Sequence, residues 1–504
     1  MPRVVATHVV SPVEAEAFLA PRDDLVVERL VVPGRFEADG GPFSSYLRTV
    51  ELRPDGDRAV VEERIEFAID APFWRLLVGL PMRRALGRWP RPTALPWWHP
   101  PDRFDRRSAT VLALLCSIAI VGGYLGTLIT QTITFAADEF GASRTDQGAI
   151  LAVTRVGVLV AVVLGAVADR RGRRRVLGLA AAAGCVVTAT GALAPTLPWL
   201  GVSQVVARGF AGALLLLVGI VSAEEMPKNS RAWAFSLITM TAALGAGMCV
   251  WLLPLADLAP WAWRLLYVVP VLGLPLTVWV VRRLPESRRF QQEHVEAEMA
   301  GHGRRFWLLA VSGFMLAVFA APATQFLNEF LRDERNYSAA DITIFVLVTS
   351  TPGGIGILAG GRLADLRGRR LIGAIGILGG TLAVVVRFGT AGAVMWLASI
   401  VGTIIGGLVV PALGVYRPEL FPTSLRGRAA GVLELIALAG SSAGLLAVGY
   451  LADRWNEFAW PMAIMAGAPL IVVVLVLTVY PETAHRSLEE LNPEDHLTNQ
   501  TSES

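Results

Sequence analysis

The chain has little charge and only one lysine. Charged residues make up 17% of its 504 residues, whereas a typical soluble domain holds roughly a quarter. Lys228 lies in no Gly-x-x-x-x-Gly-Lys-Ser/Thr loop, which excludes a P-loop ATPase. Cys116, Cys185 and Cys249 fall in apolar stretches, so neither a disulfide framework nor a metal site is predicted. The six histidines form no nucleophile–base pattern, and we expect no catalytic residue, no cofactor and no enzyme activity.

Long apolar runs dominate what is present. From about residue 108 onward, runs of about 20 apolar residues recur, each long enough to cross ~30 Å of hydrocarbon as a helix. Such segments must be helical, because a bilayer offers backbone amides no other partner. The sequence therefore predicts an all-α membrane protein with twelve spans, near 109–131, 147–167, 176–194, 200–222, 233–254, 264–283, 306–328, 341–361, 371–387, 392–415, 429–450 and 459–479.

Four short patterns in the loops return after an offset of 195 or 196 residues. A repeat of this kind indicates two homologous halves, each with six helices. The patterns and their second copies are Gly165-x-x-x-Asp169-Arg170-x-Gly172-Arg173-Arg174 and Gly361-x-x-x-Asp365-Leu366-x-Gly368-Arg369-Arg370, Glu224-x-x-Pro227-x-x-x-Arg231 and Glu419-x-x-Pro422-x-x-x-Arg426, Leu255-Ala256-Asp257 and Leu451-Ala452-Asp453, and Pro285-Glu286 and Pro481-Glu482.

Basic residues are distributed unevenly between alternate loops. Counted together with the arginines at the adjoining ends of the spans, the loops after spans 2, 4, 6, 8 and 10 hold 20 Lys and Arg, against six for the other loops. The positive-inside rule then places the first set, and both termini, in the cytosol. The single lysine indicates genomic base bias, so we expect the plasma (inner) membrane of a bacterium.

The segment before the first span has a different composition. Residues 1–88 are predicted to form a small α+β cytosolic domain, with strands near 25–32, 46–52 and 60–69. Within it, residues 72–88 mix large apolar side chains with arginines, as an interfacial helix does. A Pro- and Trp-rich linker follows at 89–107. This domain is interpreted as a tethered accessory unit, with a lipid or ligand sensor as the alternative.

The remaining boundaries follow from the spans and the repeat. We expect an N-terminal six-helix bundle at 108–284, a cytosolic central loop at 285–305, a C-terminal six-helix bundle at 306–480 and a cytosolic tail at 481–504.

The repeated loop motif resembles the signature loop of the major facilitator superfamily. Three further patterns resemble its sugar-porter branch, namely Pro285-Glu286-Ser287-Arg288-Arg289, Glu419-Leu420-Phe421-Pro422-Thr423-x-x-Arg426-Gly427 and Pro481-Glu482-Thr483. The resemblance implies two pseudo-symmetric bundles that rock about a central site. It also implies a cytosolic gate in which Asp169 engages the start of span 11 and Asp365 the start of span 5. The residues assigned to this gate are Gly165, Asp169, Arg170, Gly172, Arg173, Glu224, Arg231, Gly361, Asp365, Gly368, Arg369, Arg370, Glu419 and Arg426.

The chain departs from that branch at several positions. Leu125 follows Gly123-Tyr124 where related symporters often carry an acid, and span 7 offers Gln325 and Asn328 in place of paired glutamines. These departures weaken the expectation of proton coupling through span 1 and of hexose recognition.

Ionisable and polar residues inside spans are costly and commonly face a cavity or a partner helix. Arg208, with Arg155, is predicted to give the cavity a positive potential that suits an anionic or polyhydroxyl substrate; snorkelling to the headgroups is the alternative. Glu434, with Arg208, is a candidate for proton coupling, although it is also expected to belong to the gate. The residues assigned to the substrate path are Tyr124, Thr127, Gln131, Arg155, Arg208, Gln325, Asn328 and Ser441, for which helix–helix contacts are the alternative.

The sequence thus predicts a secondary active transporter that moves a small polar organic solute, a sugar or an organic acid, by alternating access. Proton symport is the expected energy source, with facilitated diffusion open. The expected partners are this solute, protons and the lipid bilayer; no nucleic acid is expected, and the chain is expected to be a monomer. An efflux antiporter and a non-transporting membrane sensor are the rival interpretations.

Overall fold

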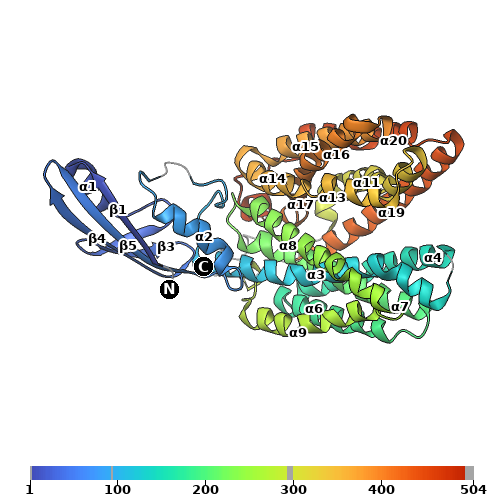
Figure 1. Cartoon of the computed structure of the whole chain (residues 1–504), viewed down its shortest axis with the longest axis horizontal. Coiled ribbons are helices and arrows are strands. Elements are labelled where there is room, and N and C mark those ends of the chain that lie inside the picture. Colours follow the sequence, from blue (N-terminus) through green and yellow to red (C-terminus); the bar gives the residue numbers. More distant parts are fainter. Residues whose placement is uncertain (1–2, 92–94, 143, 292–298, 494–504) are drawn as a thin grey trace.

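The computed structural model describes residues 3–91, 95–142, 144–291 and 299–493. An N-terminal unit containing a β-sheet extends from one end of a large helical body (Figure 1). Parts of the predicted linker, central loop and tail, at 92–94, 292–298 and 494–504, lie outside the described residues.

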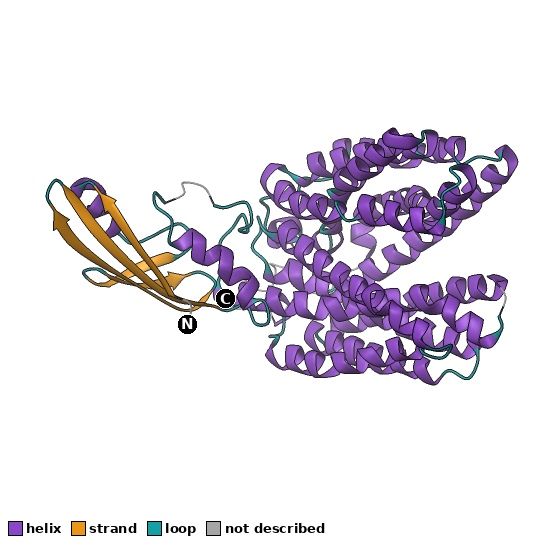
Figure 2. Ribbon diagram, viewed as in Figure 1, coloured by secondary structure: helices purple, strands orange, loops and turns teal. Residues whose placement is uncertain are grey.

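The N-terminal unit is built on a five-stranded antiparallel sheet with the order β1-β5-β4-β3-β2 (Figure 2). Its strands are β1 Arg3–Val10, β2 Val27–Val32, β3 Arg35–Gly40, β4 Phe43–Asp55 and β5 Arg58–Ile69. The expected strands correspond to β2, β4 and β5, whereas β1, β3 and the short helix α1 (Pro12–Phe18) were not predicted. A small α+β unit before the first span is therefore confirmed.

A buried ion-pair network lies in this unit. The Arg48 guanidinium, with no exposed surface, contacts the carboxylates of Glu28 at 2.7 Å and Glu63 at 3.2 Å. Tyr46 also donates its hydroxyl to Glu28. Because burial of an unpaired charge is costly, these partners are needed together. The unit thus has a specific interior of its own.

The expected interfacial segment contains the helix α2 (Arg75–Leu86), which lies between the sheet and the helical body (Figure 1). Met82 and Leu86 are buried against the sheet unit, while Leu76 and Leu77 are 86% and 68% exposed. Just before the helix, the Trp74 indole donates to the Ala113 carbonyl and the Ser117 hydroxyl of the first span. One face of α2 is therefore apolar and uncovered beside the first spanning helix.

The described residues contain twelve helices long and apolar enough to cross a membrane. Asp105 caps the first of them by accepting from the Ser108 amide, and Gly141, at φ 63°, ends it. In chain order the spans are formed by α3 (Arg106–Phe140); α4 (Arg144–Thr154) with α5 (Val158–Arg171); α6 (Arg173–Thr190); α7 (Leu197–Glu225); α8 (Arg231–Leu252); α9 (Arg264–Arg283); α11 (Gly303–Gln325); α13 (Ala339–Ser350) with α14 (Gly353–Arg367); α15 (Arg369–Gly389); α16 (Gly392–Gly407) with α17 (Val409–Gly414) and α18 (Tyr416–Glu419); α19 (Arg426–Trp455); and α20 (Ala459–Met465) with α21 (Gly467–Thr478).

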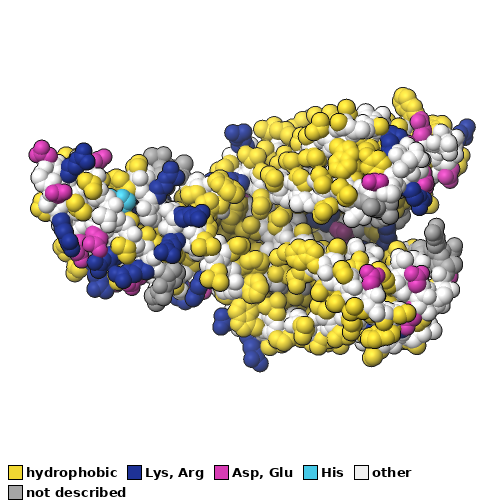
Figure 3. Space-filling view, viewed as in Figure 1, with side chains coloured by type: hydrophobic (Ala, Val, Ile, Leu, Met, Phe, Trp, Pro, Cys, Tyr) yellow, Lys and Arg dark blue, Asp and Glu magenta, His cyan; other side chains and the backbone are white. Residues whose placement is uncertain are grey.

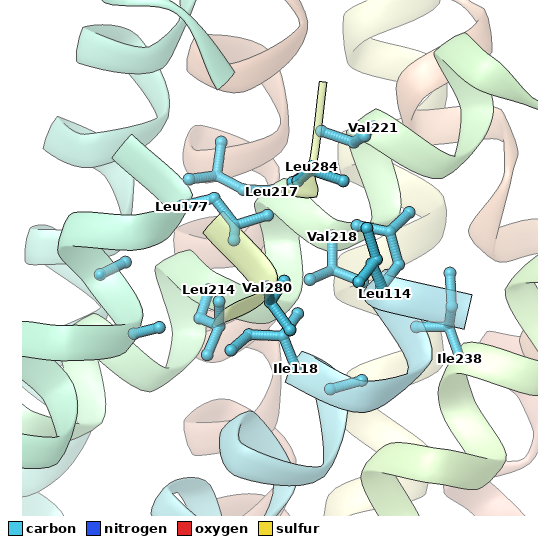
Figure 4. Packing of buried hydrophobic residues seen from close by; sticks show 14 of the residues in the cluster. Leu114, Ile118, Leu177, Leu214, Leu217, Val218, Val221, Ile238, Val280 and Leu284 are labelled. Carbon is cyan, nitrogen blue, oxygen red and sulfur yellow. The ribbon is translucent and has the colours of Figure 1, made fainter. Parts of the chain in front are cut away.

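The same helix crossing holds each half together. In the first half α3 packs on α8, where a Cβ on Gly123 would lie 1.8 Å from the Ala242 carbonyl oxygen. In the second half α11 packs on α19, where a Cβ on Gly444 would lie 2.0 Å from the Val318 carbonyl oxygen. Glycine is required at both crossings because the backbones touch. Leucine, isoleucine and valine side chains from α3, α6, α7, α8 and α9 fill the first half beside this crossing (Figure 4).

The two halves form separate six-helix bundles that meet at one end only. The largest contacts between the bundles are those of α5 with α19 and of α8 with α14, and smaller ones join α8 to α17 and α7 to α18 and α19. These contacts lie at the end that carries the sheet unit, which we call the closed end. At the opposite end, the open end, the bundles diverge, and a cleft between them is visible in the space-filling view (Figure 3).

Candidate functional site

Two buried glutamates lie at the centre of the closed end. The Glu224 carboxylate pairs with Arg173 of its own bundle at 3.4 Å and with Arg426 of the other bundle at 2.9 Å. Glu419 likewise pairs with Arg369 of its own bundle and with Arg231 of the other bundle, the latter at 3.3 Å. None of these side chains is more than 3% exposed.

Each glutamate is therefore shared between the two bundles in a pseudo-twofold arrangement. Because both carboxylates are removed from water, each requires its arginines to offset the loss of hydration. Separation of the bundles removes one arginine from each glutamate.

Two aspartates join the bundles through helix starts. Asp169 accepts hydrogen bonds from the amides of Gly427 at 3.1 Å and Arg428 at 3.0 Å, at the start of α19. Asp365 accepts from the amides of Ala232 at 3.2 Å and Trp233 at 2.8 Å, at the start of α8. The first turn of a helix has free amides and a partial positive charge that favour a carboxylate. Both contacts implied by the family resemblance are present.

Glycines allow the backbones to come this close. A Cβ on Gly165 would lie 2.6 Å from the Gly427 carbonyl oxygen, and one on Gly427 would lie 2.2 Å from that of Gly165. At the related crossing, a Cβ on Gly361 would lie 2.6 Å from the Ser236 hydroxyl and 2.7 Å from the Ala232 carbonyl oxygen. The glycines of the motif thus permit the aspartates to reach the helix starts.

The repeated Pro-Glu pattern has a structural role that the sequence analysis did not assign. Gly172 and Gly368 have φ values of 99° and 100°, which favour glycine, and each turns the chain into the next helix. Glu286 accepts from the Arg173 amide at 2.9 Å, and Glu482 accepts from the Arg369 amide at 3.0 Å. The recurrence of Pro-Glu at the shared offset was the feature of the sequence that could have indicated this role.

A further ion pair joins the tail to the segment after the first bundle. Arg289 contacts Glu489 at 2.6 Å. Burial alone raises the pKa of the Glu489 carboxyl, but the hydrogen bond and charge of Arg289 lower that pKa to about 2. The pair therefore stays ionised at ordinary pH.

Among the described residues, two that were assigned to the gate form no hydrogen bond or ion pair with the other bundle. Arg170 is exposed. The Arg370 guanidinium donates to the carbonyls of Val476 and Leu477, which belong to its own bundle. The motif brings several arginines into one loop, and only the arginine directly after the glycine points inward.

A cavity of about 770 Å³ lies between the bundles. Its wall includes Arg155 and Arg208 from the first bundle and Gln325, Glu434 and Ser441 from the second. The residues that the structure describes give neither Arg155 nor Arg208 a hydrogen-bond or ion-pair partner. Two cationic groups without acidic partners thus face one side of the cavity.

The opposite wall carries an ion pair. Glu434 contacts Arg417 at 2.6 Å, and the two side chains are 49% and 38% exposed. Glu434 therefore lies in the cavity and pairs within its own bundle, whereas the gate contacts of Asp169 are made to α19 amides. Arg417 was not singled out from the sequence, because it follows span 10 in a stretch of mixed polarity.

Several residues expected on the substrate path lie elsewhere. Tyr124 is 5% exposed and donates its hydroxyl to the Leu266 carbonyl, inside the first bundle. Thr127, Gln131 and Asn328 are not among the residues that line the cavity. The sequence analysis chose these residues because they are polar. A polar side chain in a span can instead form a hydrogen bond with a neighbouring helix. On the first span it is Gly126 that lines the cavity.

Together the fold and the gate define a multi-pass membrane transporter built from two related bundles. The sequence model of the Major Facilitator Superfamily matches residues 111–405 and, in a second match, residues 310–499. The chain belongs to this family, and it is not an enzyme.

Two relatives are named as transporters of small organic acids. The chain is 23% identical over 350 residues to the cis,cis-muconate transport protein of Acinetobacter baylyi, with 65% of this chain and 83% of the relative covered. It is 25% identical over 409 residues to the shikimate transporter of Escherichia coli, with 69% and 89% covered.

Solved structures support the fold. The proton:xylose symporter XylE, bound to 6-bromo-6-deoxy-D-glucose, matches with a TM-score of 0.65 at 16% identity, covering 77% of this chain and 98% of that chain. The twelve-helix, two-bundle fold is therefore confirmed.

The glycine crossing at the closed end predicts a position-specific effect. We expect Gly427→Ala to destabilise the closed end by about 1–3 kcal/mol, because the new methyl group meets backbone that cannot move aside. Gly467→Ala is the matched control, since a Cβ there meets nothing within 4 Å. Thermal unfolding of both purified variants measures the difference. An equal melting temperature for the two variants would contradict this account of the crossing.

Proposed function

We propose that the protein is a secondary active transporter that carries a small organic carboxylate through the central cavity by alternating access. The observation that supports this most directly is the pair of cavity arginines, Arg155 and Arg208, without acidic partners among the described residues. Desolvated guanidinium groups bind carboxylates with short, charge-assisted hydrogen bonds. The named solutes of two relatives, muconate and shikimate, are also carboxylates.

The closed end supplies the first half of an alternating-access cycle. In the proposed cycle the solute enters from the open end and is bound while Glu224, Glu419 and the two gate aspartates hold the other end shut. A solute that binds the reverse conformation better than this one shifts the population toward it. The Glu224–Arg426 and Glu419–Arg231 contacts then break, and the solute leaves at the opposite end.

We further propose that Glu434 couples this movement to a proton. Glu434 neutralises Arg417 in the empty cavity, because the two side chains form an ion pair at 2.6 Å. Protonation of Glu434 removes that pairing and frees Arg417 to bind the carboxylate of the solute. Proton and anion then occupy the cavity together, which is the requirement for symport.

In the proposed membrane orientation the closed end faces the cytosol, together with both termini. The loops at this end hold most of the Lys and Arg residues beside the spans. The helix α2 then lies in the cytosolic leaflet, where Leu76 and Leu77 meet acyl chains and Arg83 and Arg84 meet headgroups.

The cavity arginines predict the selectivity of transport. We expect Arg208→Gln to raise the KM for cis,cis-muconate or shikimate uptake by about tenfold or more, because a buried carboxylate loses its cation. Arg332→Gln, which removes an exposed arginine paired with Asp333, is the control and should leave the KM unchanged. Uptake of radiolabelled solutes, with neutral xylose as a comparison, measures this. Normal KM values in the Arg208 variant would exclude the anion site.

The proton step predicts a different signature. We expect Glu434→Gln to bind the carboxylate without loss, because Arg417 is left free, but to lose accumulation driven by a pH gradient. Accumulation in proteoliposomes with and without the gradient measures this. Glu329→Gln, at an exposed carboxylate outside the cavity lining, is the control. Retained gradient-driven accumulation in the Glu434 variant would remove Glu434 from the coupling step.

The orientation predicts which end an impermeant reagent reaches. Cysteines placed at Arg171 and Arg367, both exposed at the closed end, should react with an impermeant maleimide only after cells are permeabilised. A cysteine at Leu193, which is 79% exposed beyond the other end of α6, should react in intact cells. Labelling of the first two positions in intact cells would invert the proposed orientation.

A further inference from the structure

The linker between the N-terminal unit and α3 lies against both bundles at the closed end. On the first bundle, the Asp102 carboxylate accepts from the Asn229 amide at 3.2 Å and from the Asn229 side chain at 3.0 Å, and the Asp102 amide donates to the Ser230 hydroxyl at 2.9 Å. On the second bundle, the Arg362 guanidinium donates to the carbonyls of His99 and Leu95. The linker therefore bridges the boundary that must open.

The linker also contacts the gate itself. The Phe104 ring meets the Trp233 ring edge-on, with centroids 5.7 Å apart. The Trp233 amide is one of the two donors that hold Asp365. Arg362 lies three residues, about one helical turn, before Asp365 on α14. The linker thus contacts both sides of the gate contact between Asp365 and the start of α8.

The N-terminal unit fixes the linker in this place. Leu95 and Trp98 pack against the apolar cluster of the sheet unit, and Arg103 pairs with Asp23 of that unit. His99 is 3% exposed. The linker therefore has a defined position.

The two halves of the chain differ at the positions that the linker contacts. The offset of 196 residues aligns Arg362 with Ala166, and the offset of 195 residues aligns Asn229, Ser230 and Trp233 with Ser424, Leu425 and Arg428. By contrast, the charged residues that make the contacts between the bundles are the same in both halves: Asp169 and Asp365, Arg173 and Arg369, Glu224 and Glu419, and Arg231 and Arg426. The residues that contact the linker are therefore specific to one half of the chain, and the gate contacts that both halves share do not depend on them.

We propose that the N-terminal unit and its linker act as a clasp that stabilises the conformation closed at this end. Asp102 and Phe104 hold the linker on the first bundle, and Arg362 binds the linker carbonyls from the second. When the closed end opens, the bundles move apart and Arg362 loses its acceptors. The accessory unit therefore sets the balance between the two conformations of the transporter.

The clasp rests on the proposed function only in that the closed end must be able to open. The test measures the distance between the bundles at this end by double electron–electron resonance spectroscopy. Spin labels are attached to cysteines at Arg171 and Arg367 of the full chain, with Cys116, Cys185 and Cys249 replaced by alanine. The readout is the ratio of separated to closed populations, which requires no transported solute.

We expect Arg362→Ala to raise this ratio by about tenfold, the size that the loss of a charge-assisted hydrogen bond gives. Asp102→Ala should raise the ratio as well, because it releases the linker from the first bundle. Arg175→Ala, which removes an exposed arginine near the same end, is the control and should leave the ratio unchanged.

The double variant Asp102→Ala/Arg362→Ala distinguishes the clasp from a direct effect of Arg362 on the gate. Through the clasp the two substitutions act on one contact, so the double variant should match the stronger single variant. Fully additive effects, or an unchanged ratio in both single variants, would overturn the proposal. Loss of uptake for every tested solute with the expected ratios intact would overturn the proposed function and leave the clasp standing.

Discussion

Two carboxylates buried between two bundles are the interaction on which the closed end depends. Glu224 and Glu419 each take one arginine from their own bundle and one from the other. Each bundle supplies one arginine to its own glutamate, and docking adds the second arginine to both sites at the same time. Removing one partner from a buried ion pair costs free energy, and this cost stabilises the closed conformation. The cavity exists because docking at one end leaves the bundles apart at the other.

The cavity and the gate use charge in different ways. At the gate every carboxylate described above has arginines or helix amides as partners. These partners hold the charged groups in fixed positions. In the cavity, Arg155 and Arg208 are free of such partners among the described residues, while Arg417 is paired with Glu434. A fixed charge network suits a structural contact, whereas unpaired cations suit a ligand that comes and goes. The contrast is the physical basis for separating gate residues from substrate residues.

The sequence predicted the architecture well because hydrophobic length and repetition are read directly from residues. The twelve spans, the two halves and the partners of Asp169 and Asp365 follow from those two signals and the family resemblance. The cavity wall was predicted less well. Tyr124 looked like a lining residue by polarity, yet its hydroxyl is satisfied by the Leu266 carbonyl. Which face of a helix meets the cavity depends on packing between helices distant in sequence, and one sequence does not carry that information.

The loops that present the gate aspartates are shaped from within each bundle. Glu286 and Glu482 bind the amides that follow Gly172 and Gly368, and neither contact involves the other bundle. Undocking therefore leaves these turns folded. In the proposed transport cycle, each half then meets the other with its loop surface already formed, so the bundles can dock again as rigid bodies without refolding these turns.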